Sequence, residues 1–389
     1  PVRLPPAPTP SWKLWKENDA AYHCRTWVHD GRGLQRIGVP RHVAIHHVRP
    51  AHPQQRSAQT LYPVSEFPVD DPHSYSKPWE IRTDSLVLDL SIDFDSSIVK
   101  GVASHYIDIN GQNAADTFIL DIDKLHFDSV WVDGNKVDYD IGEDDELLGA
   151  PLYNPVDPTS RKIDVFYSSD PSSRAFLWVE PNQTADKEFP FVFTQGQAIL
   201  TRSWIPCQDS PGVRFPYSAT ILVPKGMMAV MSADNPTQKD SSGVYTFQME
   251  LPVPAYLIAL AAGNLNFASV GDHTGVYCEP SMVDACKYEF AEMEKMLEAA
   301  EDLYGKYRWG RYDIIILPPG FPFGGMENPR LTFATPTIIA GDRSLTSLIA
   351  HELAHSWSGN LVTNETWDDF WLNEGFTTYF ERRIMESLY

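Results

Sequence analysis

The stretch Leu-Val-Leu-Asp-Leu-Ser-Ile-Asp-Phe at residues 86–94 decides the character of the first half of the chain. Apolar side chains stand at every second position from Leu86 onward, and mostly polar side chains fill the positions between them. A period of two places successive side chains on opposite faces of a strand. The stretch therefore predicts a half-buried β-strand at the start of a β domain.

Further strand-like stretches follow downstream, separated by turn residues. Asp133-Gly134 has the composition of a two-residue hairpin turn. Many short strands with almost no helical pattern are typical of a sandwich or a saddle-shaped sheet. We therefore predict an N-terminal β-sandwich or saddle domain over residues 66–270, with strands at residues 102–109, 117–122, 130–132, 163–167, 219–223, 228–231 and 244–249.

Beyond residue 270 the apolar period lengthens to that of a helix. Residues 290–303 carry apolar side chains at helical spacing, and we expect this helix to end near Gly305. The continuous aliphatic run at residues 314–317 is followed directly by two prolines and predicts a buried strand. These features indicate a mixed α/β domain over residues 271–389.

The two ends of the chain differ from the rest. Residues 1–65 are rich in Pro, Arg and His and poor in acidic residues, so we expect a disordered leader. An organellar transit peptide stays open as an alternative, although serine is scarce. The chain begins with Pro1, and Tyr389 lies inside a helical pattern, so we expect a fragment whose second domain is incomplete at the C-terminus. Four leader histidines could bind a metal, but no core elements fix their geometry and a solvated tail is favoured: His42, His46, His47 and His52.

The composition excludes several kinds of partner. The 389 residues include 52 acidic and 31 basic side chains, a formal net charge of −21, which repels phosphate backbones and anionic membranes. We expect neither nucleic acid nor a membrane as a partner. The longest uncharged apolar run, residues 255–262, is far shorter than the roughly 20 residues of a membrane-spanning helix. The four cysteines lack CxxC spacing, which argues against a disulfide framework and favours a cytoplasmic location.

Two histidines and a glutamate, His351, Glu352 and His355, lie within five residues of one another. We expect a helix here that begins near Asp342 and ends near Gly359. The spacing of four places both imidazoles on one helix face, where they can hold a single metal ion. The glutamate beside the first histidine can then act as a general base on a water molecule bound to that ion.

A second metal-binding signal comes 18 residues after the second histidine, at Glu374. A carboxylate on a following helix completes a two-His, one-Glu site and leaves a fourth position for water, as catalytic zinc requires. We therefore predict one zinc ion per chain. Glu381 lies two helical turns further on, where it can accept the free ring N–H of a ligand histidine. The alternative for Glu381 is an exposed ion pair with Arg382 or Arg383.

A glycine-rich segment, Gly324-Gly325-Met326-Glu327, follows the predicted buried strand. Glycines let a substrate backbone come close, and an extended segment can pair with a peptide as an added strand. Glu327 can anchor a cation. Read alone, the segment would be a glycine turn with a surface glutamate, but the zinc pattern nearby favours substrate binding.

The motifs at residues 324–328, 351–355 and 373–375 together resemble the gluzincin aminopeptidases of the aminopeptidase-N superfamily. The sequence around them, from about residue 68 onward and including residues 359–363, looks like the leukotriene A(4) hydrolase group of that superfamily. This resemblance implies an N-terminal β saddle, a thermolysin-like zinc peptidase domain, and a C-terminal helical domain that the sequence does not contain.

The resemblance also implies roles for individual residues. Glu327 and Gln197 would hold the free α-amine of the substrate, which makes the enzyme an exopeptidase. Phe323 departs from the tyrosine expected before the two glycines, so the substrate preference stays open. The tyrosine that stabilises the tetrahedral intermediate in the family would lie beyond Tyr389.

We therefore predict a zinc metallo-aminopeptidase that releases N-terminal residues from peptides by zinc-activated water, with Glu352 as the general base. Leukotriene A(4)-type epoxide hydrolysis at the same zinc site is the alternative enzyme reading, with a lipid epoxide as substrate, and a deep apolar channel would discriminate it. A third reading is a catalytically weak, truncated binding protein. The intact set of site residues argues for an enzyme.

Overall fold

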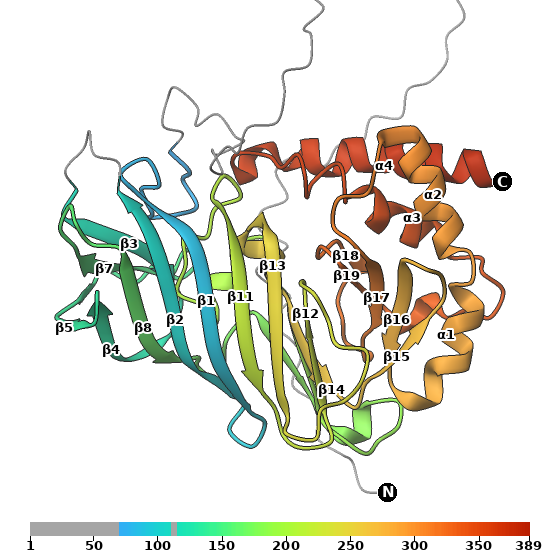
Figure 1. The fold of residues 1–389 in the computed structure, drawn as a ribbon, viewed down its shortest axis with the longest axis horizontal. Helices are drawn as coiled ribbons and strands as arrows, with labels where there is room; N and C mark the ends of the chain where they lie inside the picture. Colours follow the sequence, from blue (N-terminus) through green and yellow to red (C-terminus); the bar gives the residue numbers. More distant parts are fainter. Residues whose placement is uncertain (1–69, 110–114) are drawn as a thin grey trace, which may run out of the picture. The chain divides into compact units, whose positions relative to one another are not determined.

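The computed structural model describes residues 70–109 and 115–389, and the predicted leader at residues 1–65 lies outside the described residues. The described residues all belong to one compact unit. No helix in the described ranges is both long enough and apolar enough to cross a lipid bilayer. The elements that position the candidate site all belong to this unit (Figure 1).

The largest sheet in the described residues has seven strands in the order β13-β11-β1-β2-β8-β4-β5. β1 contains the opening stretch and pairs in parallel with β11 and antiparallel with β2. The buried side chains of β1 alternate along most of its length, as the period of two predicts. The strand bounds are β1 Ile81–Asp93, β2 Ile98–Ile109, β4 His126–Val132, β5 Asn135–Val137, β8 Lys162–Ser168, β11 Arg214–Leu222 and β13 Val244–Pro254.

Two smaller sheets complete the β-rich region. Their strand orders are β3-β7-β6 and β12-β14-β10-β9. Among the described residues before residue 283 there is no α-helix, which agrees with the predicted sheet-rich domain. The strand bounds are β3 Thr117–Ile122, β6 Asp140–Ile141, β7 Ala150–Pro155, β9 Phe176–Val179, β10 Phe191–Thr194, β12 Met228–Met231 and β14 Leu260–Gly263.

A mixed sheet and four helices follow, and Figure 1 shows the helices grouped around this sheet. The strand order is β15-β16-β17-β19-β18, with parallel pairing of β17 to β16 and to β19. The two-residue strand β18 is therefore an edge. The bounds are β15 Asn266–Ser269, β16 Thr274–Cys278, β17 Tyr312–Ile316, β18 Gly325–Met326, β19 Leu331–Ala334, α1 Val283–Glu289, α2 Met293–Tyr304, α3 Ser347–Ala354 and α4 Phe370–Leu388.

The helix that carries the two histidines is shorter than the sequence predicts. α3 begins at Ser347, whereas Asp342 accepts a hydrogen bond from the Ser344 N–H at 3.0 Å in a turn that precedes the helix. The expected start near Asp342 is therefore wrong, because this aspartate caps a local turn and not the helix. α3 also ends before Gly359, and His355 is the residue directly after its last turn.

Two other local predictions are confirmed. Asp133 and Gly134 both have positive φ, 47° and 80°, as a two-residue hairpin between β4 and β5 requires. Gly305 ends α2 with a φ of 92°, a conformation that favours glycine. The predicted helix over residues 290–303 is interrupted at its start, since Phe290 follows α1 and α2 begins at Met293.

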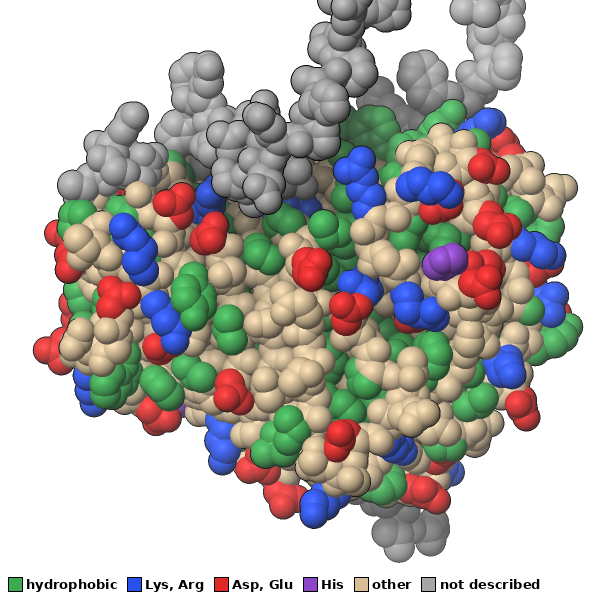
Figure 2. All heavy atoms as spheres, viewed as in Figure 1, with side chains coloured by type: hydrophobic (Ala, Val, Ile, Leu, Met, Phe, Trp, Pro, Cys, Tyr) green, Lys and Arg blue, Asp and Glu red, His purple; other side chains and the backbone are tan. Residues whose placement is uncertain are grey.

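The apolar interior consists of two clusters. The first extends from the seven-stranded sheet through β10 and β14 to side chains of β17 and β19, such as Ile315 and Phe333. The second lies between the mixed sheet and the helices and includes Ile349 of α3 and Ile384 of α4. On the face shown in Figure 2, acidic and basic side chains are interspersed. Charge on that face is therefore not concentrated over one element.

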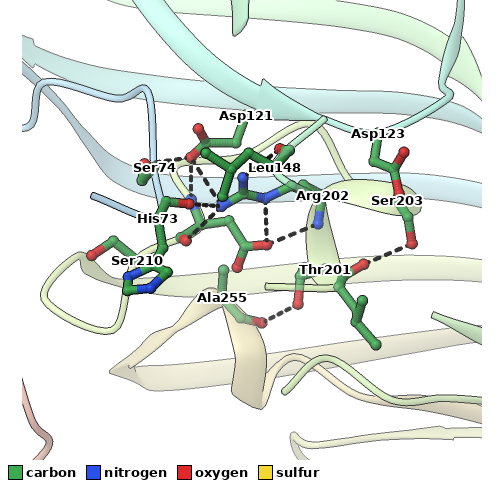
Figure 3. Close-up of polar contacts among 12 residues, drawn as sticks. His73, Ser74, Asp121, Asp123, Leu148, Thr201, Arg202, Ser203, Ser210 and Ala255 are labelled. Atoms are coloured by element: carbon green, nitrogen blue, oxygen red, sulfur yellow. Dashed lines mark hydrogen bonds and ion pairs between the residues drawn. The ribbon is translucent and has the colours of Figure 1, made fainter. Parts of the chain in front are cut away.

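A buried ionic cluster connects distant parts of the β-rich region (Figure 3). The Arg202 guanidinium is 0% exposed and donates to Asp209 Oδ2, to the Leu148 carbonyl and to the His73 carbonyl, at 3.2, 2.7 and 2.7 Å. Asp121 lies 3.8 Å from the same guanidinium. We call Arg202, Asp121 and Asp209 the Arg202 cluster. It joins the segment around His73 to the segment that leads from Gln197 to β11.

Candidate metal centre and substrate cavity

The end of α3 and the first turns of α4 bring three metal-binding side chains together. The Nε2 atoms of His351 and His355 are 3.2 Å apart. Glu374 places Oε2 at 3.3 Å from His351 Nε2 and Oε1 at 3.8 Å from His355 Nε2. In a tetrahedral zinc site with ligand bonds of about 2.0–2.1 Å, donor atoms lie about 3.3 Å from one another. The three predicted ligands therefore fit a zinc ion in donor type and in spacing.

The second ring nitrogen of each histidine has its own acceptor. His351 Nδ1 lies 3.2 Å from Glu381 Oε2, and His355 Nδ1 lies 3.0 Å from the Ser358 carbonyl oxygen. Such contacts hold the proton on Nδ1 and turn Nε2 toward a metal. The structure thus brings Glu381 to His351. Of the two arginines in the alternative reading, Arg383 pairs with Glu386 at 2.9 Å.

Electrostatics differ between the two imidazoles. Burial lowers the pKa of His355 to about 4, so its ring is neutral near pH 7, as a metal ligand must be. For His351, burial opposes the charged form, but the contact with Glu374 and the charge of Glu352 raise the pKa to about 9. The carboxylates around His351 therefore favour a positive charge at this place, whether a proton or a metal ion.

Glu352 faces the glycine-rich segment. Burial, and after it the charge of Glu327, raises the pKa of Glu352 well above its usual range. A Cβ atom on Gly325 would lie 2.2 Å from Glu352 Oε1 and 2.5 Å from its Cδ. Residue 325 must therefore be glycine for the carboxylate to keep its place. A Cβ on Gly324 would meet Leu348 of α3 at 3.1 Å, which is a milder restriction.

Most of the predicted site residues line one cavity of about 390 Å³. Its lining contains Gln197, Glu327, Glu352 and the three candidate ligands. The Glu327 side chain is buried, its Oε1 atom has no hydrogen-bond partner in the structure, and burial raises its pKa to about 7. Gln197 Nε2 is likewise buried without a partner. Two polar side chains that line the cavity thus have unmet hydrogen-bonding capacity.

Met326 differs from its neighbours in the glycine-rich segment. Gly324, Gly325 and Phe323 line the cavity, whereas Met326 packs in the larger hydrophobic cluster and accepts a contact from Gln195 Nε2 at 3.3 Å. Its side chain is not among the lining residues. The sequence pattern alone did not distinguish the inward-facing methionine from the flanking glycines.

Sequence reasoning missed several residues that support the site. Thr377 of α4 has its hydroxyl 3.1 Å from His355 Nδ1 and donates to the Ser358 carbonyl at 3.0 Å. Its position three residues after Glu374 on one helix face is a signal that could have identified it. Asn360 donates hydrogen bonds to the backbone carbonyls of His355 and Glu327, and only the fold brings those two segments together.

The fold and the donor set together are those of a zinc metallopeptidase domain behind a sheet-rich N-terminal domain. The profile described as "Peptidase M1 N-terminal domain" matches residues 71–257, and the profile described as "Peptidase family M1 domain" matches residues 288–389. The chain belongs to peptidase family M1.

Comparisons with individual proteins support this family assignment. The chain is 45% identical to leukotriene A-4 hydrolase of Xenopus laevis over 82% of its own length and 54% of the relative. It is 54% identical to human aminopeptidase B over 54% of its own length and 33% of the relative. The solved structure of native leukotriene A4 hydrolase from Saccharomyces cerevisiae superposes with a TM-score of 0.78 at 38% identity, covering 83% of this chain and 51% of that one. The chain thus spans between a third and about half of these relatives.

Proposed function

We propose that this protein is a zinc aminopeptidase that removes N-terminal residues from peptides with a free α-amine. The observation that carries the proposal is the position of Glu327. Its buried carboxylate, with one oxygen lacking a partner, lines the same cavity as His351, His355 and Glu374. A site that pairs a metal centre with a buried anion suits a substrate that carries a positive charge beside the bond to be cleaved.

Each residue has a distinct task in this proposal. His351, His355 and Glu374 would hold zinc, which when bound polarises the scissile carbonyl and makes water a better nucleophile. Glu352 accepts the proton of the attacking water and later donates it to the leaving amine. Glu381 and the Ser358 carbonyl orient the two imidazoles through their Nδ1 atoms. Glu327 accepts hydrogen bonds from the substrate ammonium, and the side-chain oxygen of Gln197 would accept another.

The edge strand β18 supports peptide binding. Gly325 and Met326 pair with Ala334 and Phe333 on one side, and the order of the mixed sheet leaves the other side of β18 without a neighbouring strand among the described residues. A peptide can extend such an edge by main-chain hydrogen bonds. Because Gly325 lies against Glu352, a peptide held there passes the proposed general base.

The test compares substrates that differ only at the amine. The zinc-loaded protein is assayed with a leucyl peptide and with the same peptide N-acetylated, in wild type and in Glu327→Gln. We expect wild type to cleave only the free peptide well, and Glu327→Gln to lose on the order of 10–100-fold in kcat/KM, since a charge-assisted hydrogen bond is lost. Glu298→Gln, an exposed glutamate of α2, is the control. Equal cleavage of both peptides by wild type contradicts the proposal.

A lipid epoxide is the second candidate substrate because a relative is named leukotriene A-4 hydrolase. The lining of the cavity favours a peptide amine instead. Four glutamates, two histidines and a glutamine line it, whereas its large apolar side chains are Phe323 and Leu348. Such a lining matches a charged group better than a fatty-acid chain.

We also propose domain bounds of 66–270 and 271–389, and a cytoplasmic location. The nearby ends of the two matched profiles, at residues 257 and 288, support a boundary in this region. The three described cysteines are all buried and free, which suits a reducing compartment. Fractionation of cells that express the tagged full-length protein would test the location.

A further inference from the structure

Asn360 lies in the loop after α3 and contacts both halves of the candidate site. It is 1% exposed, and its backbone N–H donates to the His355 carbonyl at 3.0 Å. Its side-chain Nδ2 donates to the Glu327 carbonyl at 2.7 Å. One residue therefore joins the backbone of a metal-ligand candidate to the backbone of the residue proposed to bind the substrate amine.

The loop that carries Asn360 is itself fixed by the β-rich region. Arg214, at the start of β11, donates from Nη2 to the Asn360 carbonyl at 2.6 Å and to the Pro252 carbonyl at 2.9 Å. Its Nη1 also donates to the Thr363 hydroxyl. A forked guanidinium can hold several acceptors in one geometry. The position of Asn360 is thus set from β11 and from α3 together.

This arrangement controls a distance on which an exopeptidase depends. The α-amine of a substrate is separated from the first scissile carbonyl by a single Cα atom. The spacing between the amine-binding carboxylate and the metal therefore decides whether the first or a later peptide bond is cleaved. Groups that must be placed to within about 0.5 Å need rigid support from outside the site. Asn360 gives that support because it contacts both backbones.

We propose that Asn360, held by Arg214, is the positioning residue that fixes the distance between Glu327 and the metal centre and so confines cleavage to the first peptide bond. The inference rests on the proposed aminopeptidase function and adds to it a residue that touches neither substrate nor metal. The β-rich region thereby takes part in substrate specificity through Arg214.

The test uses the affinities of two ligands to report the distance between Glu327 and the metal, and it needs no turnover. L-leucine hydroxamate carries a zinc-binding group one Cα away from its amine, and β-homoleucine hydroxamate carries it one methylene further. Calorimetry on the zinc-loaded protein gives the affinity ratio of the two ligands. We expect wild type to prefer the α-amino ligand, and both Asn360→Ala and Arg214→Lys to lower this ratio about tenfold, as the loss of a buried hydrogen bond allows.

Controls separate this inference from the proposed function. Val362→Ala lies in the same loop with a side chain that is 76% exposed, and it should leave the ratio unchanged. Zinc content and the far-ultraviolet circular dichroism spectrum are measured for every variant. Arg214→Lys keeps the positive charge and the Asn360 side chain, so it reports on the ratio even where Asn360→Ala fails to fold.

The outcomes are distinguishable. An unchanged ratio in a folded, zinc-loaded Asn360→Ala or Arg214→Lys protein overturns the positioning role and leaves the aminopeptidase proposal intact. Equal wild-type affinity for L-leucine hydroxamate and its N-acetyl derivative overturns the amine site itself. A lowered ratio in the variants with a normal zinc content supports the inference.

Discussion

At the scale of single residues, Glu352 of α3 and His355, directly after α3, are proposed to have separable tasks. The Glu352 carboxylate lies against Gly325, whereas His355 contributes Nε2 to the group formed with His351 and Glu374. Glu352→Gln should therefore retain zinc and lose about 10²–10⁴-fold in turnover, because an amide of nearly the same shape cannot accept the proton. His355→Ala should lose the zinc. Atomic emission analysis and peptidase assays on both variants measure the two effects.

His126 provides the control for the metal analysis. This exposed histidine of β4 pairs with Asp170 far from the cavity, so His126→Ala should keep a full equivalent of zinc. A full equivalent in His355→Ala would exclude this histidine as a ligand. Turnover of Glu352→Gln within a few-fold of wild type would exclude Glu352 as the base.

The sequence identified the residues whose spacing along the chain matches that of zinc ligands. His351, His355 and Glu374 fall into this class, and their side chains meet as the spacing predicts. Ser358 does not, because it acts through its backbone carbonyl, which any residue carries. Asn360 does not either, because only the fold brings its side-chain amide to the Glu327 carbonyl. Glu327 is an intermediate case. The sequence motif identified it as a candidate, but only its burial in the structure explains its raised pKa.

At the scale of elements, β18 and α3 approach each other so closely that residue 325 needs to be glycine. In Gly325→Ala the new Cβ would lie 2.2 Å from Glu352 Oε1, so the carboxylate or the strand must move. We expect an overpacking cost of about 1–3 kcal/mol and a large loss of turnover. Urea unfolding and peptidase assays measure both.

Gly375→Ala is the matched comparison within α4. A Cβ there meets nothing within 4 Å, and alanine is the better helix former, so this variant should be more stable by about 0.5–1 kcal/mol. Destabilisation in Gly375→Ala, or normal activity in Gly325→Ala, would contradict the packing argument.

The pairing of β1 with β2 buries a histidine that predicts a pH dependence of stability. His105 is fully buried between Thr83 and the Pro206 carbonyl, and burial lowers its pKa from 6.5 to about 4. Below pH 6.5 the unfolded chain binds a proton that the folded chain does not, so His105 makes stability fall as the pH drops from about 6.5 to about 4. The shift corresponds to about 3 kcal/mol at most.

His105→Gln should flatten this dependence, since glutamine can still donate to the Pro206 carbonyl and does not titrate. The free energy of unfolding in urea at pH 7.5 and pH 5 measures the slope. An equal slope in His105→Gln and wild type would show that this histidine does not contribute.

Strands were predictable from the sequence where one face is buried and the other is exposed to solvent. β3 has the predicted bounds, and the β4–β5 hairpin turns at Asp133 and Gly134. β10, β12 and β14 are buried at every residue, so no alternation marks them, and of these three short apolar runs only β12 was predicted. β18 is too short for any periodic signal, and only its pairing with β19 defines it.

At the scale of the whole molecule, the larger hydrophobic cluster does not stop at the β-rich region. It includes Leu331 and Phe333 of β19, which carries the edge strand β18 beside the cavity. Arg214 adds polar contacts from β11 to the loop after α3. Sequence patterns mark the two regions but not these contacts, because side chains far apart in the chain make them. The geometry of the candidate site therefore depends on packing that begins in the seven-stranded sheet.

The Arg202 cluster gives the last prediction because it joins parts of the chain that are far apart in the sequence (Figure 3). Arg202 and Asp209 are both buried, and Asp121 accepts bonds from the Tyr75 N–H at 2.7 Å and the Ser74 hydroxyl at 2.6 Å. Arg202→Met would leave two buried carboxylates without their cation. Breaking a buried pair in this way typically costs about 3–5 kcal/mol.

Urea unfolding of Arg202→Met should therefore show a loss of that size, whereas Arg383→Met should change stability by about 0–1 kcal/mol, since its pair with Glu386 is exposed. Adding Asp121→Asn and Asp209→Asn to Arg202→Met should recover part of the loss, because the uncompensated charges are then removed. If Arg202→Met and Arg383→Met cost the same, the buried cluster contributes no more than a surface ion pair. The anchoring of the segment that leads from Gln197 to β11 must then come from its apolar neighbours, such as Trp204 and Ile205.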